Sequence, residues 1–261
     1  MTTPGPIAVF DSGLGGLTVL RALIDLVPDQ SFVYFGDTGR FPYGPKPRDE
    51  ILKCALEITD VLLVRDAQLI VVACNSAASV ALDAIREHTD VPVVGVIEPG
   101  LRAATHVTRT GRVGVIGTVG TIASGAYQQA AGAGVELTCA ACPGFVELVE
   151  AGDVESDQIY VLAERLLAPV KAAGVDALIL GCTHYPLLAR VIGDVMGREV
   201  TLVSSADETA FEVRELLGDQ RPKPSVPTRS FVTSGDSDTF RRLAGRFLGP
   251  EVEAVEVHSW S

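Results

Sequence analysis

Two cysteines, Cys74 and Cys182, each directly follow a run of apolar residues. Cys74 lies in "VVACNSA" and precedes Asn75 and Ser76, whereas Cys182 lies in "LILGCTH", two residues before His184. A thiol reacts as its thiolate, which a helix N-terminus or a cationic neighbour stabilises. Independent buried cysteines would rarely recur at matching positions, so the pair, rather than either residue alone, indicates a function.

Two paired thiols could bind a metal, carry out redox chemistry, attack a substrate or transfer protons. A metal site needs further ligands within reach, and neither C-x-x-C nor H-x-x-x-H spacing surrounds Cys74 or Cys182. The one C-x-x-C motif, from Cys139 to Cys142, is followed by a Pro-Gly pair rather than by a helix. We interpret its two cysteines as packing residues.

Proton transfer accounts for both thiols better than nucleophilic attack does. A Cys–His nucleophile would use one thiol and leave the other unexplained. A disulfide between Cys74 and Cys182 stays open from the sequence, although it gains little in a reducing compartment. Two thiols that face one carbon atom from opposite sides could act as paired general bases. Such a pair inverts a stereocentre without a cofactor or a metal, and we expect neither here.

Both cysteines end predicted strands of an α/β fold. Short apolar runs rich in Val and Ile alternate with amphipathic segments, a pattern typical of parallel sheets that helices cover on both faces. This alternation predicts a doubly wound architecture. The expected helices include 17–27, 50–66, 76–89 and 160–174, and the expected strands are 7–10, 31–35, 69–73, 91–96, 112–117, 135–139, 177–180 and 199–203.

The two cysteine motifs also indicate two similar halves. Each motif places a cysteine and an amide or hydroxyl residue after a buried strand, and we expect the chain to cross between the halves at 96–100, "VIEPG". The tail contains a further predicted strand, 230–235, and a helix, 238–249. Ligands of open α/β sheets bind at the carboxyl ends of the strands, which is where both motifs lie.

The first turn, "FDSGLGGLTVL", is rich in glycine and partly resembles a dinucleotide-binding motif. Gly13 and Gly15 fit a G-x-G-x-x-G motif, and Asp37 mimics the acid that binds the ribose, but Thr18 stands at the third glycine position. Asp11, at the end of the strand, would also repel a pyrophosphate. We interpret the glycines as bringing backbone amides close to a small anionic ligand.

The composition limits the classes of protein. A formal net charge of −12 lacks the basic surface that a binder of phosphate backbones needs, so we expect no nucleic acid partner. No apolar stretch reaches the length of a membrane span, and the N-terminus lacks the features of a signal peptide. The odd number of cysteines, five, favours reduced thiols. We therefore expect a cytoplasmic protein without a membrane partner.

The chain resembles the bacterial glutamate racemases, which belong to the cofactor-independent aspartate/glutamate racemase superfamily. The resemblance covers nearly the whole chain and rests on seven motifs in order: "FDSGLGGLTVL", "GDTGRFPYG", "VVACNSA", "GVIEPG", "GVIGTVGTI", "CPGFVELVEAG" and "LGCTHYPLL". It implies two pseudo-symmetric, doubly wound α/β domains with mostly parallel sheets and the active site between them. The first would contain 1–97 plus 209–261, and the second 98–208.

The resemblance also implies roles for particular residues. Cys74 would remove or return the α-proton on the D-glutamate side, and Cys182 would do so on the L-glutamate side. Asp11 would assist Cys74, and His184 would assist Cys182. Glu150 matches the family's second-domain carboxylate near that histidine.

Further positions match residues that line the substrate site of the family. These are Ser12, Pro42, Tyr43, Gly44, Asn75, Ser76, Thr118, Thr121 and Thr183. Glu147 is the nearby alternative to Glu150, although the motif marks the latter. The sequence departs from the family at Gly39, where members often carry alanine, and at Ser204, where many carry an acid; neither position is a proposed proton carrier.

The function that the resemblance implies is the interconversion of L- and D-glutamate, which supplies D-glutamate for peptidoglycan precursors, by a homodimer. The alternative enzyme is a racemase of the same superfamily that acts on aspartate, another amino acid or a hydantoin. The alternative from another class is a non-catalytic amino-acid-binding or regulatory protein, of the kind linked to gyrase inhibition.

Overall fold

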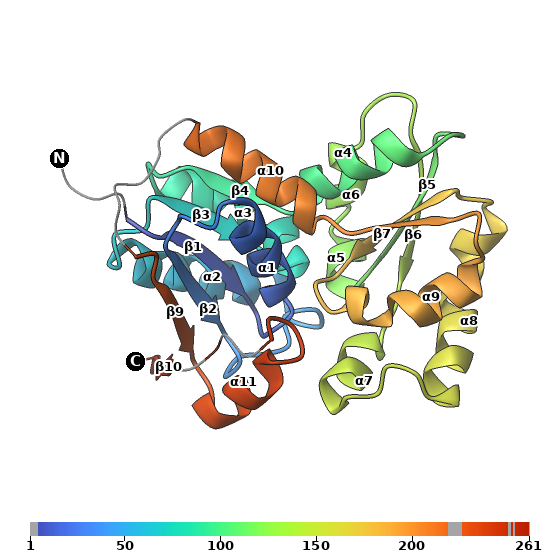
Figure 1. Cartoon of the computed structure of the whole chain (residues 1–261). Helices are drawn as coiled ribbons and strands as arrows, with labels where there is room; N and C mark the ends of the chain where they lie inside the picture. Colours follow the sequence, from blue (N-terminus) through green and yellow to red (C-terminus); the bar gives the residue numbers. More distant parts are fainter. Residues whose placement is uncertain (1–4, 219–225, 250–251, 253, 261) are drawn as a thin grey trace.

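Runs of Val, Ile and Phe form two separate parallel sheets that lie side by side (Figure 1). The computed structural model describes residues 5–218, 226–249, 252 and 254–260, so parts of the predicted terminal ranges lie outside the described residues. The strands are β1 (Ile7–Asp11), β2 (Phe32–Gly36), β3 (Leu69–Val72), β4 (Val93–Gly95), β5 (Arg112–Gly117), β6 (Glu136–Ala141), β7 (Ala177–Gly181), β8 (Thr201–Val203), β9 (Arg229–Thr233) and β10 (Val255–Val257).

The two sheets share one strand order. The larger sheet has the order β10-β9-β2-β1-β3-β4 and the smaller has β6-β5-β7-β8, so β1 to β4 correspond to β5 to β8. Every described strand pair is parallel. The repeated order makes β3 the counterpart of β7, and Cys74 and Cys182 follow these two strands. The prediction of two pseudo-symmetric, doubly wound α/β units is confirmed.

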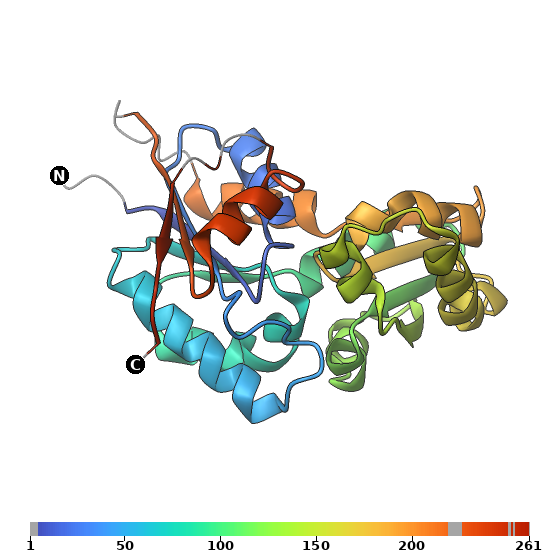
Figure 2. The same cartoon turned by 90° about the horizontal axis from the view of Figure 1, so that it is seen from below.

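Amphipathic helices cover both faces of the sheets. In Figure 2, α10 and α1 lie on one face of the larger sheet, and α2 and α3 pack together on the other. The helices are α1 (Leu17–Leu26), α2 (Arg48–Leu63), α3 (Asn75–His88), α4 (Ile97–Val107), α5 (Val119–Ala123), α6 (Ala126–Ala130), α7 (Phe145–Ala151), α8 (Asp157–Ala172), the 3₁₀ helix η1 (Tyr185–Leu188), α9 (Ala189–Met196), α10 (Ala206–Leu217) and α11 (Ser237–Ala244).

The chain crosses between the sheets through helices. The expected crossover at 96–100 lies in the right place, and its residues form the start of α4. Pro99 is tolerated because it stands in the first helical turn, where backbone N–H groups have no helical partner. The return crossing leads into α10, which packs on α1 and α4. The predicted boundaries at 97/98 and 208/209 fall within these helices and stay a prediction.

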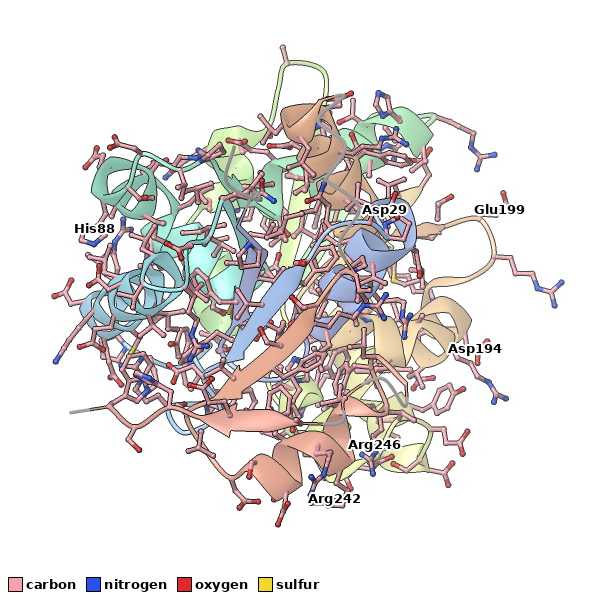
Figure 3. The ribbon with its side chains drawn as sticks, turned by 60° about the vertical axis from the view of Figure 1, so that its left-hand side comes forward. Asp29, His88, Asp194, Glu199, Arg242 and Arg246 are labelled. Atoms are coloured by element: carbon pink, nitrogen blue, oxygen red, sulfur yellow. The ribbon has the colours of Figure 1, made fainter. Side chains whose placement is uncertain are left out.

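In Figure 3, His88, Glu199 and Arg242 are labelled at the edge of the molecule, and all three are exposed. Asp29, Asp194 and Glu199 are exposed, in keeping with a strongly acidic surface. Within the described residues, no helix has both the length and the apolar character that a membrane crossing requires. Seven of the buried polar residues follow strand ends or begin helices where the two sheets approach each other: Asp11, Ser12, Asn75, Ser76, Thr121, Thr183 and His184.

Candidate active site

Cys74 and Cys182 line the same cavity. Cys182 directly follows β7, and Cys74 follows β3 after one residue, Ala73. Both cysteines are buried, at 5% exposure for Cys74 and 7% for Cys182. The cavity measures about 110 Å³, well below the 300–1,000 Å³ of sites for drug-sized ligands, so it suits a small molecule rather than a dinucleotide. Its lining contains Ser12, Phe41, Pro42, Tyr43, Gly44, Pro45, Cys74, Asn75, Ser76, Thr118, Val119, Cys142, Pro143, Gly144, Val146, Glu147, Cys182, Thr183 and His184.

The Cys74 side of the cavity contains a chain of hydrogen bonds. Cys74 precedes the first residue of α3, and its Sγ donates to Ser12 Oγ over 3.5 Å. Ser12 Oγ in turn donates to Asp11 Oδ1 over 3.2 Å. Burial and the charge of Asp11 raise the pKa of Cys74 to about 12, although the hydrogen bond with Ser12 opposes the shift. Asp11 therefore reaches Cys74 through Ser12, and the thiol is held protonated.

The Cys182 side carries an imidazole and a carboxylate instead. His184 Nδ1 lies 3.9 Å from Cys182 Sγ, and His184 Nε2 lies 2.6 Å from Glu150 Oε1. Burial alone would lower the pKa of His184, but the hydrogen bonds to Cys182 and Glu150, with the charges of Cys182 and Asp11, raise it to about 10. At neutral pH the cavity therefore has an imidazolium beside the sulfur of Cys182.

The short helix α7 presents two carboxylates to this side of the site. Glu150 contacts His184 but does not line the cavity, whereas Glu147 lines the cavity. The two residues stand one helical turn apart and so lie on the same side of α7. The structure thus separates the two candidates: Glu150 is the partner of the imidazole, and Glu147 faces the space that a ligand would occupy.

Hydrogen bonds join the two halves around the cavity. Thr183 Oγ1 donates to Asp11 Oδ2 over 2.9 Å, and Tyr127 from α6 donates to Asn75 Oδ1 over 2.9 Å. Gly15 permits this approach, since a Cβ at that position would lie 2.3 Å from Thr183 Oγ1. The glycine therefore makes room for the other half of the protein.

Three hydroxyl groups form a small cluster on one wall. Ser76 Oγ lies 3.0 Å from Thr118 Oγ1 and 3.2 Å from Thr121 Oγ1, and the two threonine oxygens lie 3.0 Å apart. Thr118 also caps α5, because its Oγ1 accepts the backbone N–H of Thr121. Thr121 is buried behind the other two and does not line the cavity. The cluster offers rotatable donors and acceptors that suit a polar ligand.

The structure brings nearly all of the residues that the sequence singled out to this cavity. Thr121, Asp11 and Glu150 are the exceptions, and each stands directly behind a lining residue. Sequence reasoning missed six lining residues: Phe41, Pro45, Val119, Pro143, Gly144 and Val146. All except Pro45 belong to the motifs "GDTGRFPYG", "GVIGTVGTI" and "CPGFVELVEAG", so their place within these motifs was the available signal.

One sequence interpretation needs correction. The N–H of Gly13 donates to Asp11 Oδ1 over 2.9 Å, so this amide is engaged within the protein rather than offered to an anionic ligand. Cys142 packs in the core, as the sequence indicated, and it also lines the cavity. Burial raises the pKa of Cys142 to about 12, which keeps its thiol unreactive. Cys139 lies half-buried in β6 and is outside the cavity.

The thiols are free in the structure. All five cysteines lie in the described part of the chain, and none forms a disulfide, including Cys74 and Cys182. Across the same residues, no group of three or more His, Cys, Asp or Glu side chains is placed to hold a metal ion.

Comparisons with known proteins agree with this geometry. Residues 15–212 match the Asp/Glu/hydantoin racemase family. A glutamate racemase from Parafrankia sp. is 52% identical over 97% of this chain and 94% of its own length. The glutamate racemase of Mycobacterium leprae is also 52% identical, over 96% of this chain and 94% of its own.

Solved structures show the same architecture. Glutamate racemase isoform RacE1 from Bacillus anthracis superimposes with a TM-score of 0.92 and 37% identity, covering 100% of this chain and 98% of that one. A glutamate racemase from Francisella tularensis, crystallised in complex with D-glutamate, gives a TM-score of 0.90 at 32% identity, with 98% of both chains covered. The protein therefore belongs to the Asp/Glu/hydantoin racemase family, among its glutamate racemases.

Proposed function

We propose that the protein interconverts L- and D-glutamate by two-base proton transfer, with Cys74 and Cys182 as the bases. The observation that carries the proposal is that both thiols line one small cavity. They follow corresponding strands of two units that share a strand order. Groups on opposite units can approach a ligand from opposite sides. This is the arrangement that inversion at a carbon atom requires.

The neighbours of the two thiols support a direction for each proton. The pKa of Cys74 is raised to about 12, whereas an imidazolium next to Cys182 stabilises negative charge on its sulfur. With L-glutamate bound, the Cys182 thiolate would take the α-proton, and the thiol of Cys74 would give its proton to the opposite face. The product is D-glutamate, with Cys74 left as the thiolate. The reverse reaction starts from that state, so no other reactant is consumed.

The lining also supports stabilisation of charge on the substrate. Loss of the α-proton places negative charge next to a carboxylate, and this charge needs hydrogen-bond donors fixed in advance. Among the described residues that line the cavity, none is Lys or Arg. Ser76, Thr118 and Asn75 would supply the donors instead, together with the N-terminal amides of α3. Ser12, Pro42, Tyr43, Gly44, Thr121 and Thr183 complete the proposed substrate site.

The biological setting follows from this reaction. We propose that the D-glutamate supplies peptidoglycan precursors and that the protein works in the cytoplasm as a homodimer. The first domain would contain 1–97 plus 209–261, and the second 98–208. The family relationship supports the setting, and the positions of β9 and β10 in the larger sheet support the division.

One assay tests the reaction. Purified protein is incubated with L-glutamate in deuterated water under reducing conditions, without pyridoxal phosphate, and circular dichroism and α-deuteration are followed. We expect racemisation in which the product acquires deuterium before the unreacted L-glutamate does, because the second base returns a proton that comes from the solvent. Absence of exchange with either enantiomer would reject the enzyme function. Exchange of aspartate but not glutamate would reject the substrate assignment.

Cysteine variants test the two bases. Cys74→Ala and Cys182→Ala should each abolish racemisation, because either change removes one of the two proton carriers. Cys139→Ala is the matched control, since this thiol lies outside the cavity, and it should retain turnover. Full turnover by either of the first two variants in both directions would reject the mechanism.

A further inference from the structure

Asp37 forms a buried polar centre outside the cavity. It follows β2, and its carboxylate is fully buried. Asp37 Oδ2 accepts from Arg40 Nε over 2.7 Å and from the hydroxyl of Tyr43. Asp37 Oδ1 accepts from Ser234 Oγ over 2.6 Å and from Trp260 Nε1 over 3.0 Å. A buried carboxylate requires such donors, and here they join three distant segments of the chain.

Trp260, near the end of the chain, packs over this centre. The guanidinium carbon of Arg40 lies 3.7 Å from the centroid of the indole, a cation–π contact. The indole also packs on His258 and on Phe35 of β2, with centroid separations of 4.4 and 5.6 Å. Trp260 therefore contributes a hydrogen bond, a cation–π contact and aromatic packing at once.

The loop 37–47, which starts at Asp37, forms part of the cavity wall. Phe41 lies against His184, with ring centroids 5.9 Å apart. The backbone oxygen of Gly44 accepts the N–H of Gly120 from the other half over 3.0 Å. The base of the loop is thus held by Trp260 and Asp37, while its far part contacts the imidazole and the opposite half. A shift at the base would move groups that line the cavity.

The approach of this loop to β9 depends on Gly39. Its N–H donates to Ser234 Oγ over 2.9 Å, and a Cβ at this position would lie 2.5 Å from the backbone oxygen of Ser234. The glycine lets the loop pack closely on the segment that follows β9, beside the Trp260 contact.

We propose that Trp260 is a positioning residue that holds loop 37–47 in the form that binds substrate. The inference rests on the proposed function, because the affinity in question is that for glutamate. Apparent affinity falls in proportion to the fraction of molecules in the competent form. Loss of a hydrogen bond to a buried carboxylate lowers that fraction, so the KM should rise about tenfold while kcat changes little.

The test compares two Trp260 variants with a matched control. Trp260→Phe keeps a ring over Arg40 but removes the N–H donor, and Trp260→Ala removes both. Glu256→Gln, in the neighbouring strand β10, removes a surface ion pair with Arg65 and the charge that faces His258. It leaves the indole of Trp260 and its hydrogen bond to Asp37 in place, so it should leave the KM unchanged. We expect the KM for both enantiomers to rise in the order control, Phe, Ala. Hydrogen exchange of the peptide 37–47 should quicken in the same order.

Three outcomes decide the inference. A lower kcat with unchanged KM in Trp260→Ala would mean that part of the protein is permanently inactive while the rest binds glutamate normally. This result would overturn the inference. Unchanged KM and unchanged exchange in a folded Trp260→Ala protein would overturn it as well. If the wild type does not racemise glutamate, the proposed function fails, and the exchange of peptide 37–47 still decides whether Trp260 holds the loop.

A second variant keeps the test open if the Trp260 variants do not fold. Gly39→Ala should push the loop away from Ser234 and raise the KM without touching the indole. Trp260 is the single tryptophan of the sequence, so its fluorescence reports on this site alone. We expect the emission of Gly39→Ala to shift relative to the wild type. If Gly39→Ala has the emission and the KM of the wild type, the coupling between the loop and Trp260 is contradicted.

Discussion

Replacing Glu150 with glutamine tests whether a carboxylate behind His184 sets the charge next to Cys182. The substituted glutamine would keep the shape of the side chain and one hydrogen bond to His184 Nε2, but it removes the negative charge 2.6 Å from the ring. A net hydrogen bond to a charged group contributes about 1.5–3 kcal/mol. If the contribution acts on the transition state, kcat/KM should fall about 10- to 100-fold.

The pH dependence of Glu150→Gln provides a second measurement. The pKa of His184, raised to about 10 in the folded protein, lies above its unfolded value of about 6.5. The pairing therefore stabilises the fold fully below the lower value, and this contribution is lost as the pH rises through the upper one. In Glu150→Gln, we expect the alkaline limb of kcat/KM to move to lower pH. The difference in unfolding free energy between wild type and variant should shrink over the same window.

The assay for Glu150→Gln is the initial rate in both directions, followed by circular dichroism across neutral and alkaline pH. Because L- and D-glutamate have equal free energies, kcat/KM must fall by the same factor from either side, which checks the data internally. Glu155→Gln, an exposed surface change, is the control. An unchanged kcat/KM with an unchanged alkaline limb in Glu150→Gln would refute the assignment of Glu150 as the partner that keeps His184 charged.

Three further predictions concern the contacts between the halves. Tyr127→Phe leaves the buried oxygen of Asn75 without its donor and should lower the unfolding free energy by about 1–2 kcal/mol, measured by urea denaturation. Gly15→Ala places a Cβ against Thr183 and should lower kcat/KM in a protein whose circular dichroism spectrum is native. Thr183→Val removes one donor from Asp11 at nearly constant volume and should lower kcat/KM about tenfold, with wild-type rates as the contradicting result.

The sequence predicts the site residues well where they stand at the end of a strand. Cys74 and Cys182 were recognisable because each ends a buried apolar run, and parallel strands gather such ends at one edge of a sheet. The eight strands of the two matching sets were predictable because each lies in a short, largely apolar run between helix-like segments. β10 was not, since its residues are half-buried or exposed and form no continuous apolar run.

Other features depend on contacts that no local pattern encodes. The amide of Gly13 could face a ligand or the side chain of Asp11, and only the folded turn distinguishes the two. The bond between Trp260 and Asp37 joins residues 223 positions apart. Phe41 could not be assigned to the cavity before the position of His184 was known. In each case the tertiary arrangement, rather than the residue type, decides the role.

The proposed reaction has two structural requirements, and the fold meets one while individual side chains meet the other. The common strand order brings both thiols to one cavity, so the fold supplies the symmetry that inversion needs. A racemase also needs its two bases in different protonation states at any moment, which symmetric surroundings would not provide. Here the neighbours differ: Cys74 faces Ser12, and Cys182 faces an imidazolium. The asymmetry that gives each proton transfer its direction therefore comes from side chains beside the strand ends, where the two halves differ.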